Sequence, residues 1–242
     1  MENKNGQGIF LGVVGVATLI VAIIGATFAF FSAQASSNNG DISGATLGGQ
    51  GAMLSLVVEK VWTSPQTGAN SLDLVPGANV SAANLQNVLD AKCTAGAATA
   101  DTVKYTGCHV YRITAKSSGT IAGANVKLTT LHTSNTAHTA NWTYIAFTGS
   151  ETAAGTFASS GNTALTGGTG TFNVSNGTFD FHDGAAMTGN QDYVYYLLIY
   201  VENEQVDQSQ GQTADVTGTY DGTITFTAAG GSEIKATFTA SS

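Results

Sequence analysis

The feature that constrains this chain most is a strict alternation of apolar and polar residues toward its C-terminus. The even positions from 216 to 226 carry Val216, Gly218, Tyr220, Gly222, Ile224 and Phe226, with Thr or Asp between them. After the run Ala-Gly-Gly-Ser at 229–232 the pattern resumes with Ile234, Ala236, Phe238 and Ala240. A period of two places these residues on one side of a β-strand. The sequence therefore predicts a β-hairpin with one buried face.

Several other segments also have the composition of strands. They are residues 52–62, 109–116, 125–131, 142–148, 170–174 and 178–182. Residues 193–201 (YVYYLLIYV) are apolar on both faces, as in the central strand of a sandwich. Residues 149–170 are rich in Gly, Thr, Ser and Ala, which predicts a long loop or a weak edge hairpin.

The composition favours the same fold class. Only 10% of the residues are charged, against about 25% in a typical globular chain, and Thr occupies many polar positions of the strands, where it packs well. One short helix is predicted with Ser81 as its N-cap, because Leu85, Val88 and Leu89 share a helical face. We expect an all-β, jelly-roll-like antiparallel β-sandwich of about eight to ten strands with one short helix.

The N-terminus has the form of an export signal. No charged residue occurs from position 5 to position 40, and residues 9–31 are strongly apolar. Small residues at Thr27 and Ala29 fit a signal peptidase site, which predicts cleavage between Ala29 and Phe30. The apolar run is also long enough to span a bilayer, which takes about 20 residues.

Two alternatives to cleavage stay open: a retained membrane anchor, and a pilin-type leader cut after Gly6 that leaves the apolar helix as a filament core. Each of these places the rest of the chain outside the cytoplasm, at the cell surface or in the extracellular space. The predicted organisation is a signal peptide or anchor over residues 1–29, a flexible segment over residues 30–50 and a β-sandwich domain over residues 51–242. The apolar export helix thus precedes the sandwich, and the chain contacts the membrane only through residues 9–31 if it stays uncleaved.

The two cysteines, Cys93 and Cys108, fit an exported protein. An oxidising exterior permits a disulfide between them. That bond would close a loop of about 15 residues and stabilise the fold by about 3 kcal/mol. Two unpaired thiols are the alternative. A zinc site is not expected, because two cysteines without a CxxC spacing cannot complete a tetrahedral set of ligands.

The four histidines do not form a catalytic or metal-binding motif. His109, His132, His138 and His182 lie outside any HExxH pattern, and the chain has no GxSxG or P-loop motif. We expect these histidines to be solvated loop residues. We also expect that the protein is not an enzyme and that it holds no cofactor and no metal.

Two other clusters have both a functional and a structural interpretation. Asp180, Asp183 and Gly184 could contribute to a calcium site, but an ordinary turn also explains them. The four tyrosines within residues 193–201 could stack on carbohydrate, but core packing of a central strand explains them as well. The formal net charge of −8 argues against nucleic acid as a partner, because phosphate backbones are also negative.

The segment GATFAFFSAQASSNNGDISGATL resembles the export signal and mature start of the TasA/camelysin group of bacterial surface proteins. The similar features are the cleavage site, the Phe30-Phe31-Ser32 run after it, and Gly-Ala-Thr-Leu at 44–47, which resembles the entry into the first strand. The final strands, YVYYLLIYVENEQ and TGTYDGTITFTA, resemble the closing strands of such jelly rolls. Two features depart from the group: Ala33 stands where Asp or Asn is common, and the segment between the two cysteines is not typical.

The resemblance implies a subunit of a biofilm-matrix fibre. In that group the new N-terminus is a donor strand that completes the sheet of the next subunit through backbone hydrogen bonds. Phe30, Phe31, Ser32 and Ala33 would begin that strand, which extends over residues 30–37. The partners would be other copies of the chain, and signal peptidase during export.

Other functions stay open beside the fibre subunit. One is a membrane-anchored monomeric surface or adhesion domain, and another is a pilin-like subunit that keeps its N-terminal helix. Camelysin-like proteins are often described as metallopeptidases, but this sequence supplies no set of metal ligands for that activity.

Overall fold

The computed structural model describes residues 15–16, 18, 42–49, 52–62, 73–74, 80–93, 105–134, 142–172, 177–201, 219–229 and 231–241. The chain divides into two compact units, Met1–Ser36 and Ser37–Ser242. In the first unit, Gly15, Val16 and Thr18 are helical. No helix within the described ranges is both long enough and apolar enough to cross a membrane, and nearly all of the apolar run 9–31 lies outside those ranges.

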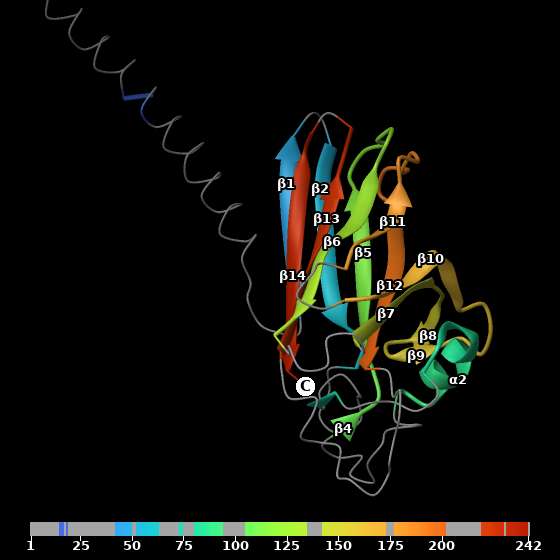
Figure 1. The fold of residues 1–242 in the computed structure, drawn as a ribbon. Coiled ribbons are helices and arrows are strands. Elements are labelled where there is room, and N and C mark those ends of the chain that lie inside the picture. The colour runs from blue at the N-terminus through green and yellow to red at the C-terminus, as the bar shows by residue number, and fades with distance from the viewer. Residues whose placement is uncertain are drawn as a thin grey trace, which may run out of the picture. The chain divides into compact units, whose positions relative to one another are not determined.

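The larger main sheet has six antiparallel strands. In spatial order they are β1 (Ile42–Gly49), β2 (Ala52–Lys60), β5 (His109–Ser117), β12 (Asp192–Val201), β7 (Trp142–Thr148) and β10 (Thr163–Thr171) (Figure 1). The segment predicted to be a central strand is central, because β12 pairs with β5 on one side and with β7 on the other.

The second main sheet has four antiparallel strands. In spatial order they are β11 (Phe179–Asp183), β6 (Asn125–Thr133), β13 (Thr219–Thr227) and β14 (Glu233–Ser241). The predicted C-terminal hairpin is β13–β14, and its register runs without a break along both strands. Two short pairs complete the described strands: β3 (Asp73–Leu74) is parallel to β4 (Tyr105–Thr106), and β8 (Glu151–Ala153) is antiparallel to β9 (Thr156–Phe157).

The two main sheets pack face to face around one core. Alternate residues of β2 and β13 point inward, so that Leu54 and Leu56 of β2 share this core with Ile224 and Phe226 of β13. The period of two in the sequence is thus the alternation between core and surface. The prediction of an all-β fold of antiparallel sheets with one short helix is confirmed.

A second core lies on the outer face of the six-stranded sheet. Helix α2 (Leu85–Asp90) buries the three apolar residues predicted for its inner face, and the β8–β9 hairpin adds Phe157. We call residues 80–93 and 151–157 the cap (Figure 1). Its sheet partners are Val110, Ile145, Phe147, Tyr196, Leu198 and Tyr200. This covering explains why β12 is apolar on both faces, with Leu197 in the first core and Leu198 in the second.

The strand-forming part of the body begins earlier than predicted. The predicted flexible segment 30–50 includes residues 42–49, but these form β1, which pairs along its whole length with β2. The sequence ISGATLGG contains three glycines and has weak strand propensity of its own, so composition did not indicate this strand, whereas the resemblance implied a strand entry at 44–47. Its pairing depends on β2, whose inward side chains build the core.

Two further local predictions are refined. Ser81 precedes a 3₁₀ turn, η2 (Ala82–Asn84), and its side chain makes no capping hydrogen bond, so α2 begins at Leu85. Residues 149–170 contain the β8–β9 hairpin and most of β10, which lies at the edge of the six-stranded sheet. The edge-hairpin alternative therefore describes this segment better than a long loop does.

Candidate functional site

The predicted cleavage and donor-strand residues lie outside the described residues. They are Ala29, Phe30, Phe31, Ser32 and Ala33, and the functions assigned to them stay predictions. The described features that bear on function are the disulfide, the polar groups held inside the sandwich, and the edges of its two sheets.

The predicted disulfide between Cys93 and Cys108 is present, with its Cα atoms 5.1 Å apart. Both cysteines are fully buried in the second core. The amide of Gly107 donates a hydrogen bond to the carbonyl oxygen of Cys93 at 3.0 Å, and the hydroxyl of Thr106 donates to the same oxygen at 3.3 Å. The bond therefore ties the end of the helical segment to the start of β5.

Arg112 joins the six-stranded sheet to the cap. Its guanidinium forms ion pairs with Glu59 of β2, its cross-strand neighbour, and with Glu151 of β8. The amide of Gly155 donates to the other oxygen of Glu151 at 3.3 Å. A planar guanidinium can serve two carboxylates at once, so this group holds the hairpin on the sheet. The three charges lie far apart in the sequence, and no local pattern indicated that they meet.

Two further hydrogen bonds position the cap. The indole nitrogen of Trp62 donates to the carbonyl oxygen of Gly155 at 2.6 Å. The side-chain amide of Gln86, on α2, donates to the carbonyl oxygen of Ala158 at 3.0 Å. The helix, the hairpin and the end of β2 are thus fastened to one another by polar contacts as well as by the second core.

The prediction that the histidines are loop residues is wrong for the three that are described, because each lies on a strand, although the side chain of His132 is 44% exposed. His109 begins β5 and is buried. His132, in β6, faces its cross-strand partner Asp221 with 3.0 Å between Nε2 and the carboxylate. His182, in β11, lies with Nδ1 2.9 Å from the hydroxyl of Tyr195. These partners come from other strands, so the sequence around each histidine did not reveal them; His138 lies outside the described residues.

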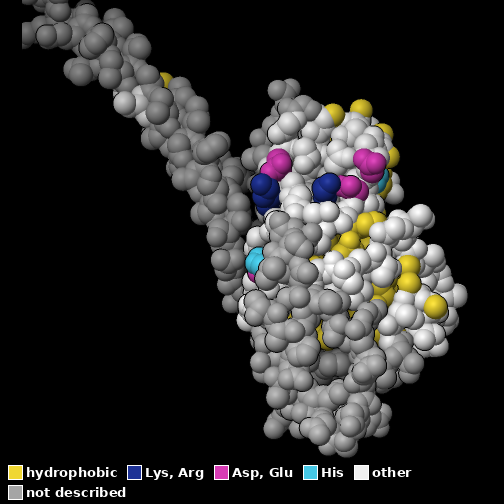
Figure 2. Space-filling view, in the orientation of Figure 1, with side chains coloured by type: hydrophobic (Ala, Val, Ile, Leu, Met, Phe, Trp, Pro, Cys, Tyr) yellow, Lys and Arg dark blue, Asp and Glu magenta, His cyan; other side chains and the backbone are white. Residues whose placement is uncertain are grey.

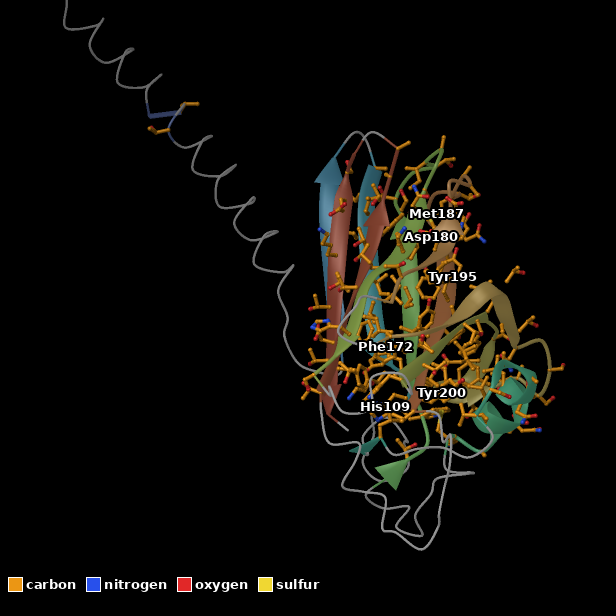
Figure 3. All side chains as sticks on the ribbon, in the orientation of Figure 1. His109, Phe172, Asp180, Met187, Tyr195 and Tyr200 are labelled. Atoms are coloured by element: carbon orange, nitrogen blue, oxygen red, sulfur yellow. A yellow bond between two sulfur atoms is a disulfide. The ribbon has the colours of Figure 1, made fainter. Side chains whose placement is uncertain are left out.

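A buried network of side-chain hydrogen bonds links the two main sheets. His109, labelled in Figure 3, lies with Nδ1 2.6 Å from the hydroxyl of Tyr220, on β13. That hydroxyl also lies 2.8 Å from the hydroxyl of Tyr111, which is on β5 with His109. Burial raises the pKa of Tyr220 well above its ordinary value, and the adjacent Tyr111 raises it further. The phenol therefore stays neutral, and the chain of hydrogen bonds helps to select one packing of the sheets.

The tyrosines of β12 are divided between two cores. Tyr195 packs toward the inner core with its ring 5.8 Å from that of Phe181, whereas Tyr196 stacks on Phe147 in the second core at 5.0 Å. Burial raises the pKa of each to about 12, with a contribution from Tyr193 for Tyr195 and from Glu151 for Tyr196. Tyr195 and Tyr196 thus act as core residues and do not form a joint carbohydrate platform.

Asp180 and Asp183 belong to strand β11, and the turn begins after them at Gly184, whose φ is 64°. The carboxylate of Asp180 forms an ion pair with Lys127 at 3.3 Å. The amide of Gly184 donates to the side-chain oxygen of Asn125 at 2.8 Å. In the part of the chain with assigned structure, no group of three or more His, Cys, Asp or Glu side chains is placed to share a metal ion.

Several charged side chains on the described part of the sandwich form ion pairs. Besides the pair on β11, Lys116 lies 3.0 Å from Asp192, and Lys235 lies 2.8 Å from Glu233. The face seen in Figure 2 accordingly shows only a few dark-blue and magenta groups among white atoms.

Comparison of the sequence with known proteins returned no match, either to a protein-family model or to a curated protein. The geometry of the sandwich and the residues that precede it are therefore the features that bear on function.

Proposed function

We propose that the chain is an exported, non-catalytic structural protein, the subunit of a surface or biofilm-matrix fibre that assembles by donor-strand complementation. The observation that carries the proposal is the place of β1 in the fold. It ends the six-stranded sheet, and its outer side pairs with no other described strand. It also follows closely on the uncharged segment 30–37. An open sheet edge and an uncharged extended segment are the two halves of a strand-addition interface.

The strand order supports a jelly-roll-like body for this subunit. The chain passes from one main sheet to the other between β5 and β6, β6 and β7, β10 and β11, β11 and β12, and β12 and β13. Repeated crossing between two packed sheets is the connectivity of Greek-key and jelly-roll proteins. This body agrees with the resemblance to the TasA/camelysin group, which rests on residues 25–47, 193–205 and 217–228.

Export and head-to-tail assembly explain the remaining features. The disulfide supports export, because such bonds persist mainly in oxidising compartments outside the cytoplasm. Cleavage after Ala29 would release Phe30 as the new N-terminus. Each copy would then donate one segment and accept another at a different surface, so the contact is heterologous. A heterologous contact builds an open filament when the rotation between successive subunits does not close a ring.

The test compares the exported protein with a variant that lacks residues 30–37. N-terminal sequencing of the exported protein should give Phe30, and electron microscopy should show fibres. The deletion variant should stay monomeric in sedimentation with unchanged circular dichroism. Phe30→Ser/Phe31→Ser should behave like the deletion, whereas the matched Ser36→Ala/Ser37→Ala variant should form fibres. Fibres from the deletion variant would place the donor segment elsewhere, and an exported protein that stays monomeric with its N-terminal helix retained would favour the anchored surface domain.

A further inference from the structure

The cap is attached to the six-stranded sheet in two different ways. The β8–β9 hairpin is held by polar contacts, among them the ion pair between Glu151 and Arg112. The helical part of the cap, residues 80–93, is joined to the start of β5 through its last residue, because Cys93 is bonded to Cys108. A reductant can break a disulfide but not an ion pair. The two parts of the cap should therefore respond differently to reduction.

The turn that brings Cys93 to its partner has an unfavourable backbone conformation. Helix α2 ends in a Schellman motif, in which the amide of Cys93 donates to the carbonyl oxygen of Val88 and the amide of Lys92 donates to that of Leu89, each at 3.0 Å. Glycine is the usual residue after such a helix end, because φ is positive there. Here Lys92 has a φ of 49° and Cys93 has a φ of 59°, a region that disfavours residues with a Cβ atom. The disulfide therefore holds a strained turn in place.

Helix α2 is too short to be stable without its attachment to the body. It has six residues, whereas isolated helices shorter than about 12–15 residues are marginal in water. Its three apolar side chains are buried in the second core. Its side chain Gln86 donates to the carbonyl oxygen of Ala158, which follows the hairpin and does not belong to the sheet. The helix therefore depends on packing against the sheet, and the disulfide enforces that packing at the end of the helical part.

We propose that the disulfide is a redox-sensitive latch, whose reduction opens residues 80–93 while the two main sheets and the β8–β9 hairpin stay folded. A dithiol supplies the two electrons: it reduces the bond in two exchange steps, becomes a cyclic disulfide, and leaves Cys93 and Cys108 as thiols. Opening uncovers the outer face of β5 and β12, where Val110 and Leu198 belong to the second core. The cap is thus closed in an oxidising compartment and opens in a reducing one. This switch does not depend on how copies of the chain assemble.

Hydrogen exchange of the full-length protein, first oxidised and then in dithiothreitol, tests the latch. The amides of residues 91–93 donate to carbonyl oxygens of α2, and they should exchange about a hundredfold faster after reduction, as a cross-link over a loop of this length implies. The amides of β12 and β13 should keep their protection. Unchanged exchange at 91–93 with both thiols titratable would overturn the latch, and so would loss of protection throughout β12 and β13. A bond that resists dithiothreitol while the sandwich is folded would overturn it as well.

A matched pair of glycine variants tests whether the strained turn drives the opening. Lys92→Gly removes the unfavourable side chain at positive φ, so in the reduced protein the amides of residues 91–93 should exchange about threefold to tenfold more slowly than without the substitution. Ala91→Gly is the control in the same turn. Ala91 has a φ of −82°, which any residue adopts, so glycine there should leave the exchange unchanged or make it faster. Equal slowing by both variants, or no slowing by Lys92→Gly, would overturn the role of the strained turn.

Discussion

The Nδ1 atom of His109 lies 2.6 Å from the hydroxyl oxygen of Tyr220, and the two residues come from different sheets. Both are buried, and the same hydroxyl lies 2.8 Å from that of Tyr111. A hydrogen bond inside a core is costly to lose, because the groups that remain have been removed from water. The Tyr220 hydroxyl is therefore a polar link between the two layers of the sandwich.

Replacing Tyr220 with Phe should lower the free energy of unfolding by about 1–3 kcal/mol, because two buried groups each lose a partner. Tyr111→Phe should cost less, since it leaves the contact between Tyr220 and His109 in place. Urea denaturation of both variants measures the difference. An equal or larger loss for Tyr111→Phe would show that the contact with His109 contributes little.

Gly222→Ala should destabilise the protein by about 1–3 kcal/mol through overpacking. Gly222 stands opposite Phe238 in the β13–β14 register, and a Cβ atom at position 222 would overlap the Phe238 ring. Trimming the ring should relieve the clash, so Gly222→Ala/Phe238→Leu should be more stable than the sum of the two single changes predicts. A double-mutant cycle from thermal or urea unfolding measures this coupling, and additive effects would contradict the steric explanation.

Loss of the disulfide should cost about 3 kcal/mol in the free energy of unfolding, as expected for a loop of this length. The Cys93→Ala/Cys108→Ala variant removes the bond and also trims two buried side chains, so unmodified protein treated with a reductant is the better comparison. Intact mass under non-reducing conditions should show no free thiol in the exported protein. Two alkylated cysteines before reduction would contradict the assignment of this bond to the exported form.

Stability should fall above about pH 10, where unfolded tyrosine begins to ionise. Burial raises the pKa of Tyr196 to about 12 in the folded protein. The stabilisation is therefore fully present below the unfolded pKa, and it is lost as the pH rises from there through the folded pKa. Urea unfolding at increasing pH should show this decline, and Tyr196→Phe should make it shallower. An identical pH profile for Tyr196→Phe would contradict the assignment of the decline to this residue.

The local pattern of residues was enough to identify most of the sandwich. The alternation from 216 to 240 gave a hairpin whose inward residues, Tyr220 to Phe226 and Ile234 to Phe238 at even positions, are buried. The two-sided apolar run 193–201 identified the central strand, and the spacing of Leu85, Val88 and Leu89 identified the buried face of α2. These features are local because a side chain's direction along a strand or helix follows from its position in the repeat.

Beyond hairpins between consecutive strands, such as β13–β14, the tertiary structure decided which strands become neighbours. The partner of the His109 ring and the two carboxylates around Arg112 come from residues distant in the sequence. Periodicity states which side of a strand a residue occupies, but it carries no information about the strand placed opposite. By itself the sequence determined a two-faced β-rich body behind an apolar segment that carries no charge from residue 5 to residue 40. Packing decided which polar residues are buried and which strands stand at the edges of the two main sheets, because both follow from long-range contacts.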